Sequence, residues 1–455
     1  MVNFINRKTE IESLERRCAN NKFEFIPIYG RRRVGKTELI KEFAKNKKHI
    51  YFLGERTGAQ ENLNRFREKV AKYYKDEILG SSTVGWKEIF NYIKNKDERV
   101  ILIIDEFPYL CELDKATSSI FQYIIDEIIK DSKIFLIFCG SSIGMMEKEV
   151  LFYKAPLYGR RTGQMYINPL KFKDVVKFFP NYSIKEKIFA YSITGGIPMY
   201  LNIVKTQRNI PGIIKNIIST DSLLYQEPVF LLREELREPR NYLLILKSIA
   251  LGFKNFGKIC NYTGISKNKL MQYLEILQDL RIVKRETPIL SKPRTKISLY
   301  RIEDNFLNFW FRFVFPNKNE IEEGLKDEVI SKINAGMDEY VAREIFEKIC
   351  MEFLLKKQPF QIQEIGRWWR KEDEIDIVAL NEETKEILFC ECKWRERKAD
   401  LNVLNELKEK AKLVQWHNDE RREYYCIFSK SGFKDELLGK ALLFDLNDFS
   451  NEFSK

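Results

Sequence analysis

Hydrophobic and polar residues follow a strand-and-helix pattern over the first third of this chain. Apolar residues dominate the runs at 23–29, 50–53, 100–104 and 134–139, and the run at 100–104 is continuous, which is typical of parallel strands covered on both faces. Amphipathic stretches within residues 1–22, 38–45 and 62–74 repeat with helical spacing. Strands that alternate with helices in this way predict an α/β domain with a parallel sheet.

A helical pattern replaces the strands from Asn241 onward. It predicts a first helix from 241, a short second helix at 256–261 and a third helix lined by apolar residues between 270 and 277, with Ser266 as its N-cap. Residues 282–288 and 297–300 then predict a hairpin. This order is the outline of a winged helix, and the aromatic segment 301–315 is expected to pack it onto a neighbour.

Two interpretations of the winged helix stay open. The polar face of its third helix would bind DNA through residue types that contact phosphates and bases, namely Lys267, Asn268, Lys269 and Gln272. A winged helix also serves as a protein-contact module, and this face carries few charges.

A strand pattern returns near the C-terminus. A helix at 340–353 precedes predicted strands at 361–365, 374–378 and 387–394, and residues 366–369 are expected to form a turn. A helix at 401–414 and a strand at 424–428 follow. Within the two longer strands the alternation places Glu374 with Asp376 on one face, and Glu391 with Lys393 on one face.

Charge and composition narrow the classes of function. Lys and Arg number 78 against 66 Asp and Glu, so the net charge of +12 favours anionic partners, nucleic acid first. A solvated basic surface explains the same excess equally well. The 8 cysteines form no C-x-x-C pair and there are only 2 histidines, which argues against a disulfide framework, a zinc knuckle and histidine-based catalysis.

No targeting or membrane segment is expected. Charges appear by Arg7, which argues against a secretory signal. The longest uncharged apolar-rich run, at 134–146, is too short to span a bilayer. We therefore expect a cytoplasmic protein without a membrane partner.

One motif carries phosphate chemistry. Residues 30–37 fit G-x-x-x-x-G-K-[ST], between a predicted strand and a predicted helix. Glycines let the backbone N–H groups face phosphate oxygens, the lysine adds a charge on the β- and γ-phosphates, and the hydroxyl can bind Mg²⁺. We expect the whole loop to bind a nucleoside triphosphate, through Gly30, Arg31, Arg32, Arg33, Val34, Gly35, Lys36 and Thr37.

Two further strand ends carry candidate catalytic residues. Asp105 and Glu106 follow the apolar run 100–104, at the edge where open α/β sheets bind ligands. Asp105 is expected to hold Mg²⁺ with Thr37, and Glu106 to orient the attacking water. A polar side chain in Gly140-Ser141-Ser142, after the next strand, either contacts the γ-phosphate or the attacking water, or caps the following helix.

Arg160 is a candidate finger for the γ-phosphate. It follows Gly159 in an apolar neighbourhood and precedes a second arginine, and a guanidinium neutralises charge in the transition state. Ordinary surface basicity explains the same pattern equally well. If Arg160 acts on a neighbouring subunit, the protein would be a homo-oligomer.

Six motifs, at residues 4–10, 30–37, 104–106, 140–142, 157–162 and 194–198, resemble in order and spacing those of the archaeal ATPase family, which belongs to the AAA+-related, STAND-like NTPases. The resemblance covers roughly the first half of the chain. It implies an enzyme that binds and hydrolyses ATP, with a P-loop NTPase core and a helical lid hinged at Gly195 and Gly196. It leaves the task of the protein open.

The C-terminal strands resemble a second group. Asp376, followed by Glu391 and Lys393 within the order helix, three strands, helix, strand, is similar to the PD-(D/E)XK nuclease superfamily. Two carboxylates on adjacent strands would hold Mg²⁺ against a scissile phosphate, and Lys393 would stabilise the developing charge. Glu347 lies where such relatives keep an extra acid, and Ile375 replaces the proline of the motif.

The predicted fold is α/β throughout. Residues 1–165 form the P-loop NTPase core, 166–238 the helical lid, 239–316 the winged helix with its packing helix, and 337–455 a restriction-endonuclease-like domain. The charged residues 317–336 are expected to be a linker. Cys390 and Cys392 are interpreted as packing thiols, because two ligands do not make a zinc site.

Three functions compete. The first is an ATP-driven enzyme that cleaves nucleic acid, with DNA and RNA both open as substrates. The second is an ATP-switched regulator that binds DNA and carries an inactive nuclease-like domain. The third is a protein-remodelling scaffold, which the charge of +12 disfavours. Joint retention of Asp376, Glu391 and Lys393 favours the first.

Overall fold

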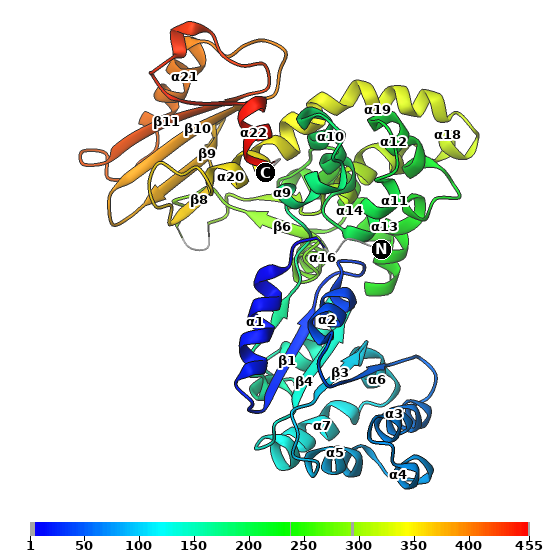
Figure 1. Cartoon of the computed structure of the whole chain (residues 1–455). Helices are drawn as coiled ribbons and strands as arrows, with labels where there is room; N and C mark the ends of the chain where they lie inside the picture. Colours follow the sequence, from blue (N-terminus) through cyan, green and yellow to red (C-terminus); the bar gives the residue numbers. More distant parts are fainter. Residues whose placement is uncertain (1–4, 237, 293–294, 454–455) are drawn as a thin grey trace. The chain divides into compact units, whose positions relative to one another are not determined.

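The computed structural model describes residues 5–236, 238–292 and 295–453 (Figure 1). The chain divides into two compact units. Unit 1 comprises the residues up to Pro169 together with Ile197–Met199, and unit 2 comprises Leu170–Gly196 and the residues from Tyr200 onward. The chain therefore passes between the units three times. Phe4, at the start of the first family motif, lies outside the described residues.

Unit 1 is built on a parallel sheet of five strands in the order β2-β3-β4-β1-β5. Its three central strands are buried along their whole length, which is why they are apolar apart from Glu24 and Asp105 at strand ends. The prediction of an α/β core with a parallel sheet is confirmed. The strands are β1 (Glu24–Tyr29), β2 (His49–Leu53), β3 (Ile101–Asp105), β4 (Phe135–Gly140) and β5 (Met165–Tyr166).

Helices fill the connections of this sheet and share its core. Phe107 stacks on Phe138 of β4 with ring centroids 3.9 Å apart, and Phe121 meets both rings edge-on. The helices are α1 (Lys8–Ala19), α2 (Lys36–Ala44), α3 (Ala59–Tyr74), α4 (Glu77–Ser81), α5 (Trp86–Lys94), α6 (Phe107–Leu113), α7 (Thr117–Tyr123) and α8 (Ile143–Met146), with π-helical turns at Ile124–Ile129 and Glu147–Leu151 and a 3₁₀ turn at Tyr158–Arg160.

A helical segment follows, and two glycines mark a chain crossing within it. Gly195 ends α10 with a φ of +64°. A Cβ on Gly196 would lie 2.0 Å from the carbonyl oxygen of Leu170, so only glycine fits there. The chain returns to unit 1 directly after Gly196; the hinge role of the pair stays a prediction. The helices are α9 (Phe172–Val175), α10 (Ile184–Thr194), α11 (Pro198–Val204), α12 (Ile210–Ile218) and α13 (Leu223–Glu235).

Three helices and a hairpin occupy the region expected to be a winged helix; we call them the three-helix module. Strands β6 and β7 pair antiparallel, with Val283 opposite Ile302. Ser266 is the N-cap of α16, but its side chain makes no capping hydrogen bond. The elements are α14 (Pro239–Ala250), α15 (Phe256–Thr263), α16 (Lys267–Asp279), β6 (Val283–Glu286) and β7 (Leu299–Ile302).

The predicted linker at 317–336 is wrong as a description of this segment. Helices α18 (Lys318–Glu322) and α19 (Lys326–Tyr340) cover most of this segment, and α17 (Asn305–Phe309) precedes it. Val329, Ile333 and Met337 repeat at intervals of four along α19 and are buried, so the helix packs through one apolar stripe while its charges face solvent. The high charge of the segment hid this stripe.

The C-terminal part of unit 2 holds a mixed sheet in the order β12-β11-β10-β9-β8. Strands β8, β9 and β10 form an antiparallel meander, and β10, β11 and β12 run parallel. The predicted turn at 366–369 is wrong, because these residues lie inside β8, with a bulge between Gly366 and Trp368. The elements are α20 (Phe346–Leu354), β8 (Glu364–Arg370), β9 (Asp373–Asn381), β10 (Glu386–Lys393), α21 (Leu401–Lys412), β11 (Arg422–Ser429), β12 (Leu442–Asp445) and α22 (Leu446–Phe453).

The β6–β7 connection is joined to this sheet. The backbone N–H of Ile289 donates a hydrogen bond of 2.7 Å to the carbonyl of Arg367 on β8. The Ile289 side chain is buried in the same apolar cluster as Trp368 and Ile375. The three-helix module and the C-terminal sheet therefore share a core within unit 2.

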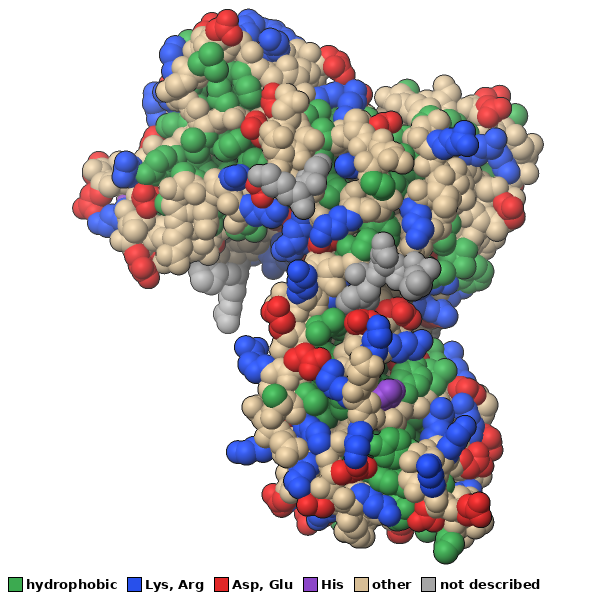
Figure 2. Space-filling view, in the orientation of Figure 1, with side chains coloured by type: hydrophobic (Ala, Val, Ile, Leu, Met, Phe, Trp, Pro, Cys, Tyr) green, Lys and Arg blue, Asp and Glu red, His purple; other side chains and the backbone are tan. Residues whose placement is uncertain are grey.

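Two surface properties bear on partners. Over the described residues, no helix combines the length and the apolar character needed to cross a membrane. On the face that Figure 2 shows, Lys and Arg side chains lie among Asp and Glu side chains rather than in one basic patch. The net charge of +12 therefore does not by itself mark a nucleic-acid surface on that face.

Candidate functional site

The phosphate loop joins β1 to α2, as its sequence predicts. Gly30 needs to be glycine because a Cβ there would lie 2.6 Å from the carbonyl oxygen of Ile167. Gly35 is the N-cap of α2 with a φ of +95°. Lys36 starts the helix, is 4% exposed, and its ammonium donates to the carbonyls of Gly30 at 2.9 Å and Arg31 at 3.0 Å. The lysine is thus held over the loop, where it would meet phosphate.

Asp105 ends β3 beside this loop. Its Oδ2 accepts hydrogen bonds from the hydroxyl of Thr37 at 2.9 Å and from that of Tyr51 at 2.7 Å. Burial, and then the hydrogen bond to Asp105, raise the pKa of Tyr51, so it stays a donor. Two hard oxygen ligands, a hydroxyl and a carboxylate, therefore lie side by side, a donor set that suits Mg²⁺.

Glu106 accepts hydrogen bonds from Ser141, the residue that follows β4. Its carboxylate accepts from the Ser141 hydroxyl at 2.6 Å and from the Ser141 backbone N–H at 3.2 Å. Glu106 itself has a left-handed backbone, with a φ of +53°. The structure brings together the candidate base and Ser141, while Ser142 caps α8 by accepting a hydrogen bond of 3.3 Å from the Met145 backbone N–H, as the capping alternative predicts.

Arg160 forms an ion pair with Asp126. Its Nε lies 3.1 Å from both carboxylate oxygens, and its Nη2 lies 2.8 Å from Oδ2. The Arg160 side chain is 30% exposed, so the pair sits near the surface. The finger role of Arg160 stays a prediction, and it requires this pair to open.

Arg7 belongs to the motif at residues 4–10, and the sequence assigns it no role in the site. It is 6% exposed, and its Nη2 donates to the carbonyls of Val34 at 3.2 Å and Asn168 at 2.7 Å. It therefore fastens the phosphate loop to the segment that leads out of unit 1. The sequence offered one signal for this role, the position of Arg7 within the short motif at residues 4–10.

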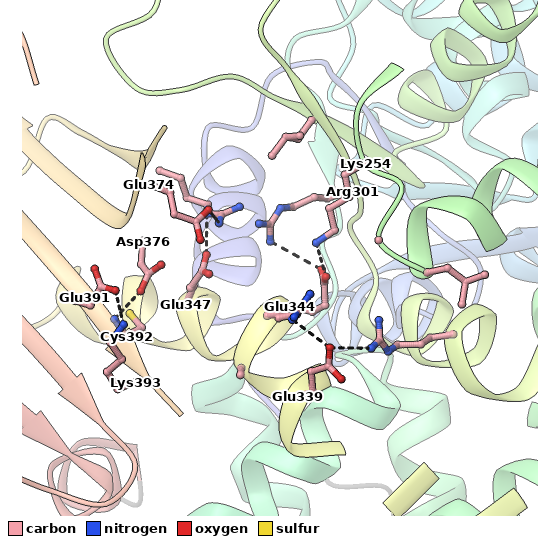
Figure 3. Close-up of a pocket in the computed structure, with 17 residues that line it drawn as sticks. Lys254, Arg301, Glu339, Glu344, Glu347, Glu374, Asp376, Glu391, Cys392 and Lys393 are labelled. Carbon is pink, nitrogen blue, oxygen red and sulfur yellow. Dashed lines mark hydrogen bonds and ion pairs between the residues drawn. The ribbon is translucent and has the colours of Figure 1, made fainter. Parts of the chain in front are cut away.

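The second site lies in unit 2, where strands β9 and β10 carry the predicted acids (Figure 3). The register that pairs Ile377 with Cys390 brings Asp376 next to Glu391. Asp376 accepts a hydrogen bond of 2.7 Å from the backbone N–H of Cys392. Lys393 Nζ lies 2.5 Å from Glu391 Oε1. Asp376, Glu391 and Lys393 line one cavity of about 610 Å³.

Electrostatics in this cavity favour a cation. Burial, and then the charge of Glu391, raise the pKa of Asp376 to about 7. Burial opposes the charged form of Lys393 as well, yet the Glu391 carboxylate raises the pKa of that ammonium. Because the Glu391 charge is one cause of the raised pKa of Asp376, a positive charge beside the two side chains would favour the ionised form of Asp376.

Glu347 enters the same cavity from α20. Burial, and then the charge of Asp376, raise the pKa of Glu347 well above its usual range. Arg367 of β8 lies 2.9 Å from Glu347 through its Nε and 3.4 Å from Glu374 through its Nη2. The sequence placed Arg367 in a turn and so missed this contact.

The three-helix module supplies another wall of the cavity. Lys254 and Arg301 both pair with Glu344, which is 5% exposed. Six basic and six acidic side chains line the cavity: Lys254, Arg301, Arg312, Arg343, Arg367 and Lys393, with Glu339, Glu344, Glu347, Glu374, Asp376 and Glu391. Because the pKa values of Asp376 and Glu347 are raised, the net charge of the cavity depends on whether these two carboxyls are protonated.

The fit to Mg²⁺ rests on two carboxylates. Within the described residues, no group of three His, Cys, Asp or Glu side chains could hold one metal ion. Mg²⁺ is often bound by one or two carboxylates with waters and substrate phosphates completing its shell. Asp376 and Glu391 on adjacent strands fit that mode, and Glu347 remains bound to Arg367.

The polar face of α16 is exposed. Lys267, Asn268, Lys269 and Gln272 all face solvent at or near the start of the helix, while Leu270 and Leu274 are buried beneath them. The structure keeps these four side chains together, as the sequence predicts.

Two family models match separate parts of the chain. Residues 4–204 match a family described as an ATPase domain predominantly from Archaea, and residues 310–407 match one described as proteins of unknown function from Archaea and bacteria. The uncharacterized protein MJECL04 of Methanocaldococcus jannaschii is 40% identical over 457 residues, which is 98% of this chain and 100% of that protein.

Two further proteins are similar in part. The uncharacterized ATP-binding protein MJ0423 of the same organism is 60% identical over 48 residues, 10% of this chain and 81% of that protein. The solved structure of the Walker-type ATPase paby2304 of Pyrococcus abyssi has a TM-score of 0.55 at 21% identity, over 68% of this chain and 96% of that chain. The similarity to the Pyrococcus abyssi structure shows a shared fold.

Proposed function

Because the chain belongs to the family of ATPases found predominantly in Archaea, we propose that it couples ATP hydrolysis to the cleavage of nucleic acid. ATP would bind in unit 1, and Mg²⁺-dependent cleavage of DNA would take place in unit 2. The contacts of the two sites supply separate arguments for the two halves of this proposal.

The nucleotide half follows from the loop contacts. Lys36, which donates to two loop carbonyls, would exchange them for β- and γ-phosphate oxygens. Thr37 and Asp105 would hold Mg²⁺, which would neutralise charge on the phosphates. Glu106 would orient the attacking water after leaving Ser141, and Arg160 would contact the γ-phosphate after leaving Asp126.

One observation carries the cleavage half: Asp376, Glu391 and Lys393 come from neighbouring strands and line a single cavity. Asp376 and Glu391 would hold Mg²⁺, which supplies an activated water and neutralises phosphate charge. Lys393 would stabilise the charge that develops on the phosphoryl oxygens. A metal ion on Asp376 and Glu391 would attract the phosphates of an anionic strand to the cavity.

Nucleic acid would be bound in part by the three-helix module, acting as a winged helix. Its exposed Lys267 and Lys269 would contact phosphates near the start of α16. The module shares Ile289 with the C-terminal sheet, so a strand bound by the module would be held at a fixed position relative to the cavity. ATP turnover would reach this unit through the chain crossings beside Gly195 and Gly196.

A second candidate function has one observation in its favour. Glu391 is held by Lys393 and Glu347 by Arg367, so two candidate acids already have cationic partners. A protein in which these pairs never open would be an ATP-switched regulator that binds DNA without cutting it. The pairs would then serve stability alone.

The experiment that separates the two functions is a cleavage assay on the whole protein. Single-stranded, double-stranded and branched DNA, and RNA of the same sequences, are incubated with protein and Mg²⁺, with and without ATP. Cleavage that requires Mg²⁺ and is lost in Asp376→Asn supports the enzyme. Binding without cleavage on every substrate supports the regulator.

A further inference from the structure

A second amine lies at Glu391. Lys410 Nζ is 3.5 Å from Glu391 Oε2, while Lys393 Nζ is 2.5 Å from Oε1. The Glu391 side chain is 8% exposed, and the two lysine side chains are about one-quarter exposed. One buried carboxylate therefore holds two ammonium groups, one on each oxygen.

The position of Lys410 on α21 is set by packing. Leu407 and Ala411 are buried against the sheet, and Lys410 stands beside them on the edge of that buried face. Lys412, two residues on, points to solvent and pairs with Glu409, with both side chains about two-thirds exposed. The same helical turn thus carries one lysine at the site and one away from it.

Two cations on one carboxylate compete with any metal ion that binds there. Once Mg²⁺ takes an oxygen of Glu391, its charge repels both ammonium groups, and each needs another anion. Lys410 also lines a second cavity, of about 700 Å³, beside α21, so its side chain has room to turn. The nearest new anion in a substrate complex would be the phosphate held by the metal.

We propose that Lys410 is a second phosphate-binding amine of the cleavage site, released from Glu391 when metal and nucleic acid bind. This inference rests on the proposed function. In the reaction, water adds across the phosphodiester: its oxygen bonds to phosphorus, the ester P–O bond breaks, and the leaving oxygen ends as a hydroxyl. Lys410 takes no part in bond making; its charge stabilises the phosphoryl oxygens.

The test compares Lys410→Ala with Lys412→Ala in the full chain. Mg²⁺ affinity is measured by calorimetry without nucleic acid, and cleavage is measured in single turnover at saturating Mg²⁺. Lys410→Ala should cleave at least about tenfold more slowly. Its Mg²⁺ affinity should be unchanged or up to about threefold tighter, because a competing charge is gone. Lys412→Ala should match the wild type in both, and Lys410→Arg should retain most of the rate.

Slower cleavage without any loss of Mg²⁺ affinity distinguishes this role of Lys410 from a structural one. If Lys410→Ala weakens Mg²⁺ binding as well as cleavage, the lysine only supports the fold around Glu391, and the inference is overturned. It is also overturned, alone, if the wild type cleaves and Lys410→Ala cleaves equally fast. If the wild type neither binds Mg²⁺ in unit 2 nor cleaves, the proposed function itself is contradicted.

Discussion

The hydroxyl of Thr37 donates a hydrogen bond of 2.9 Å to the carboxylate of Asp105, a residue 68 positions further along the chain. The parallel sheet creates this contact, because β1 and β3 both deliver their C-terminal ends to one edge. The two groups are the ligands that Mg²⁺ would share with a nucleotide. The sheet therefore holds these two proposed Mg²⁺ ligands side by side.

Lys36→Ala should lower the ATP hydrolysis rate by at least about 100-fold and weaken ATP binding, because a charge on the β- and γ-phosphates is lost. Steady-state phosphate release and nucleotide titration measure the two effects. Lys41→Ala, an exposed lysine of the same helix paired with Glu38, is the matched control and should change neither. Hydrolysis at the wild-type rate in Lys36→Ala would refute the role of the loop.

Glu106→Gln should retain ATP binding while hydrolysis falls by roughly 100-fold, because an amide cannot polarise the attacking water. Ser141→Ala tests the contact that holds Glu106. If the serine restrains the base, basal hydrolysis should rise in this variant. A fall instead would mean that Ser141 acts on the nucleotide or the water.

Removing charge from α16 should weaken DNA binding. The Lys267→Ala/Lys269→Ala variant should lose about two units of slope in a plot of log affinity against log salt, roughly one for each lost phosphate contact. Lys69→Ala/Lys72→Ala on α3 removes the same charge from unit 1 and should leave the slope unchanged. An unaltered slope in the α16 variant would make the module a protein-contact surface.

Local chemistry was readable from the sequence, and long-range pairing was not. The phosphate loop lies in eight consecutive residues, and Asp376 with Glu391 follows from strand alternation and register. Glu347 pairs with Arg367 of β8. The sequence predicts a turn at residues 366–369, so this pair could not be predicted from it. The partner of Arg160, Asp126, lies on a helix with no motif, and nothing local points to it.

The same reason explains the error over residues 317–336. Helix α19 carries one buried apolar stripe, and most of its remaining positions are charged, polar or small. Composition describes the average of a segment, whereas packing depends on one face. Equally, the sharing of Ile289 between the β6–β7 connection and the C-terminal sheet depends on contacts across domains that no local pattern encodes.

Glu344→Gln should lower the free energy of unfolding of unit 2 by about 3 kcal/mol, because the largely buried side chains of Lys254 and Arg301, 16% and 11% exposed, lose the carboxylate of buried Glu344. Glu339→Gln, whose side chain is 53% exposed, is the control and should change it by less than about 0.5 kcal/mol. Denaturant titration measures both. Equal effects in the two variants would mean that the Glu344 pairs contribute no more than surface ion pairs.

The Glu344 pairs also predict a pH dependence. Burial opposes the charged form, yet Lys254 and then Arg301 hold the pKa of Glu344 below its usual range. The stabilisation is therefore complete above the ordinary glutamate value of about 4.3 and is lost as the pH falls through the lower folded value. The wild type should lose more stability than Glu344→Gln in that acid range.

The most direct test of the coupled-enzyme proposal is a single-turnover cleavage assay with labelled DNA, Mg²⁺ and ATP, run on the wild type, Asp376→Asn and Lys36→Ala. The wild type should cut. Asp376→Asn should hydrolyse ATP and bind DNA but not cut, because one metal ligand in unit 2 is lost. Lys36→Ala should lose the ATP-dependent part of cleavage alone. Cleavage by Asp376→Asn at the wild-type rate would contradict the cleavage site.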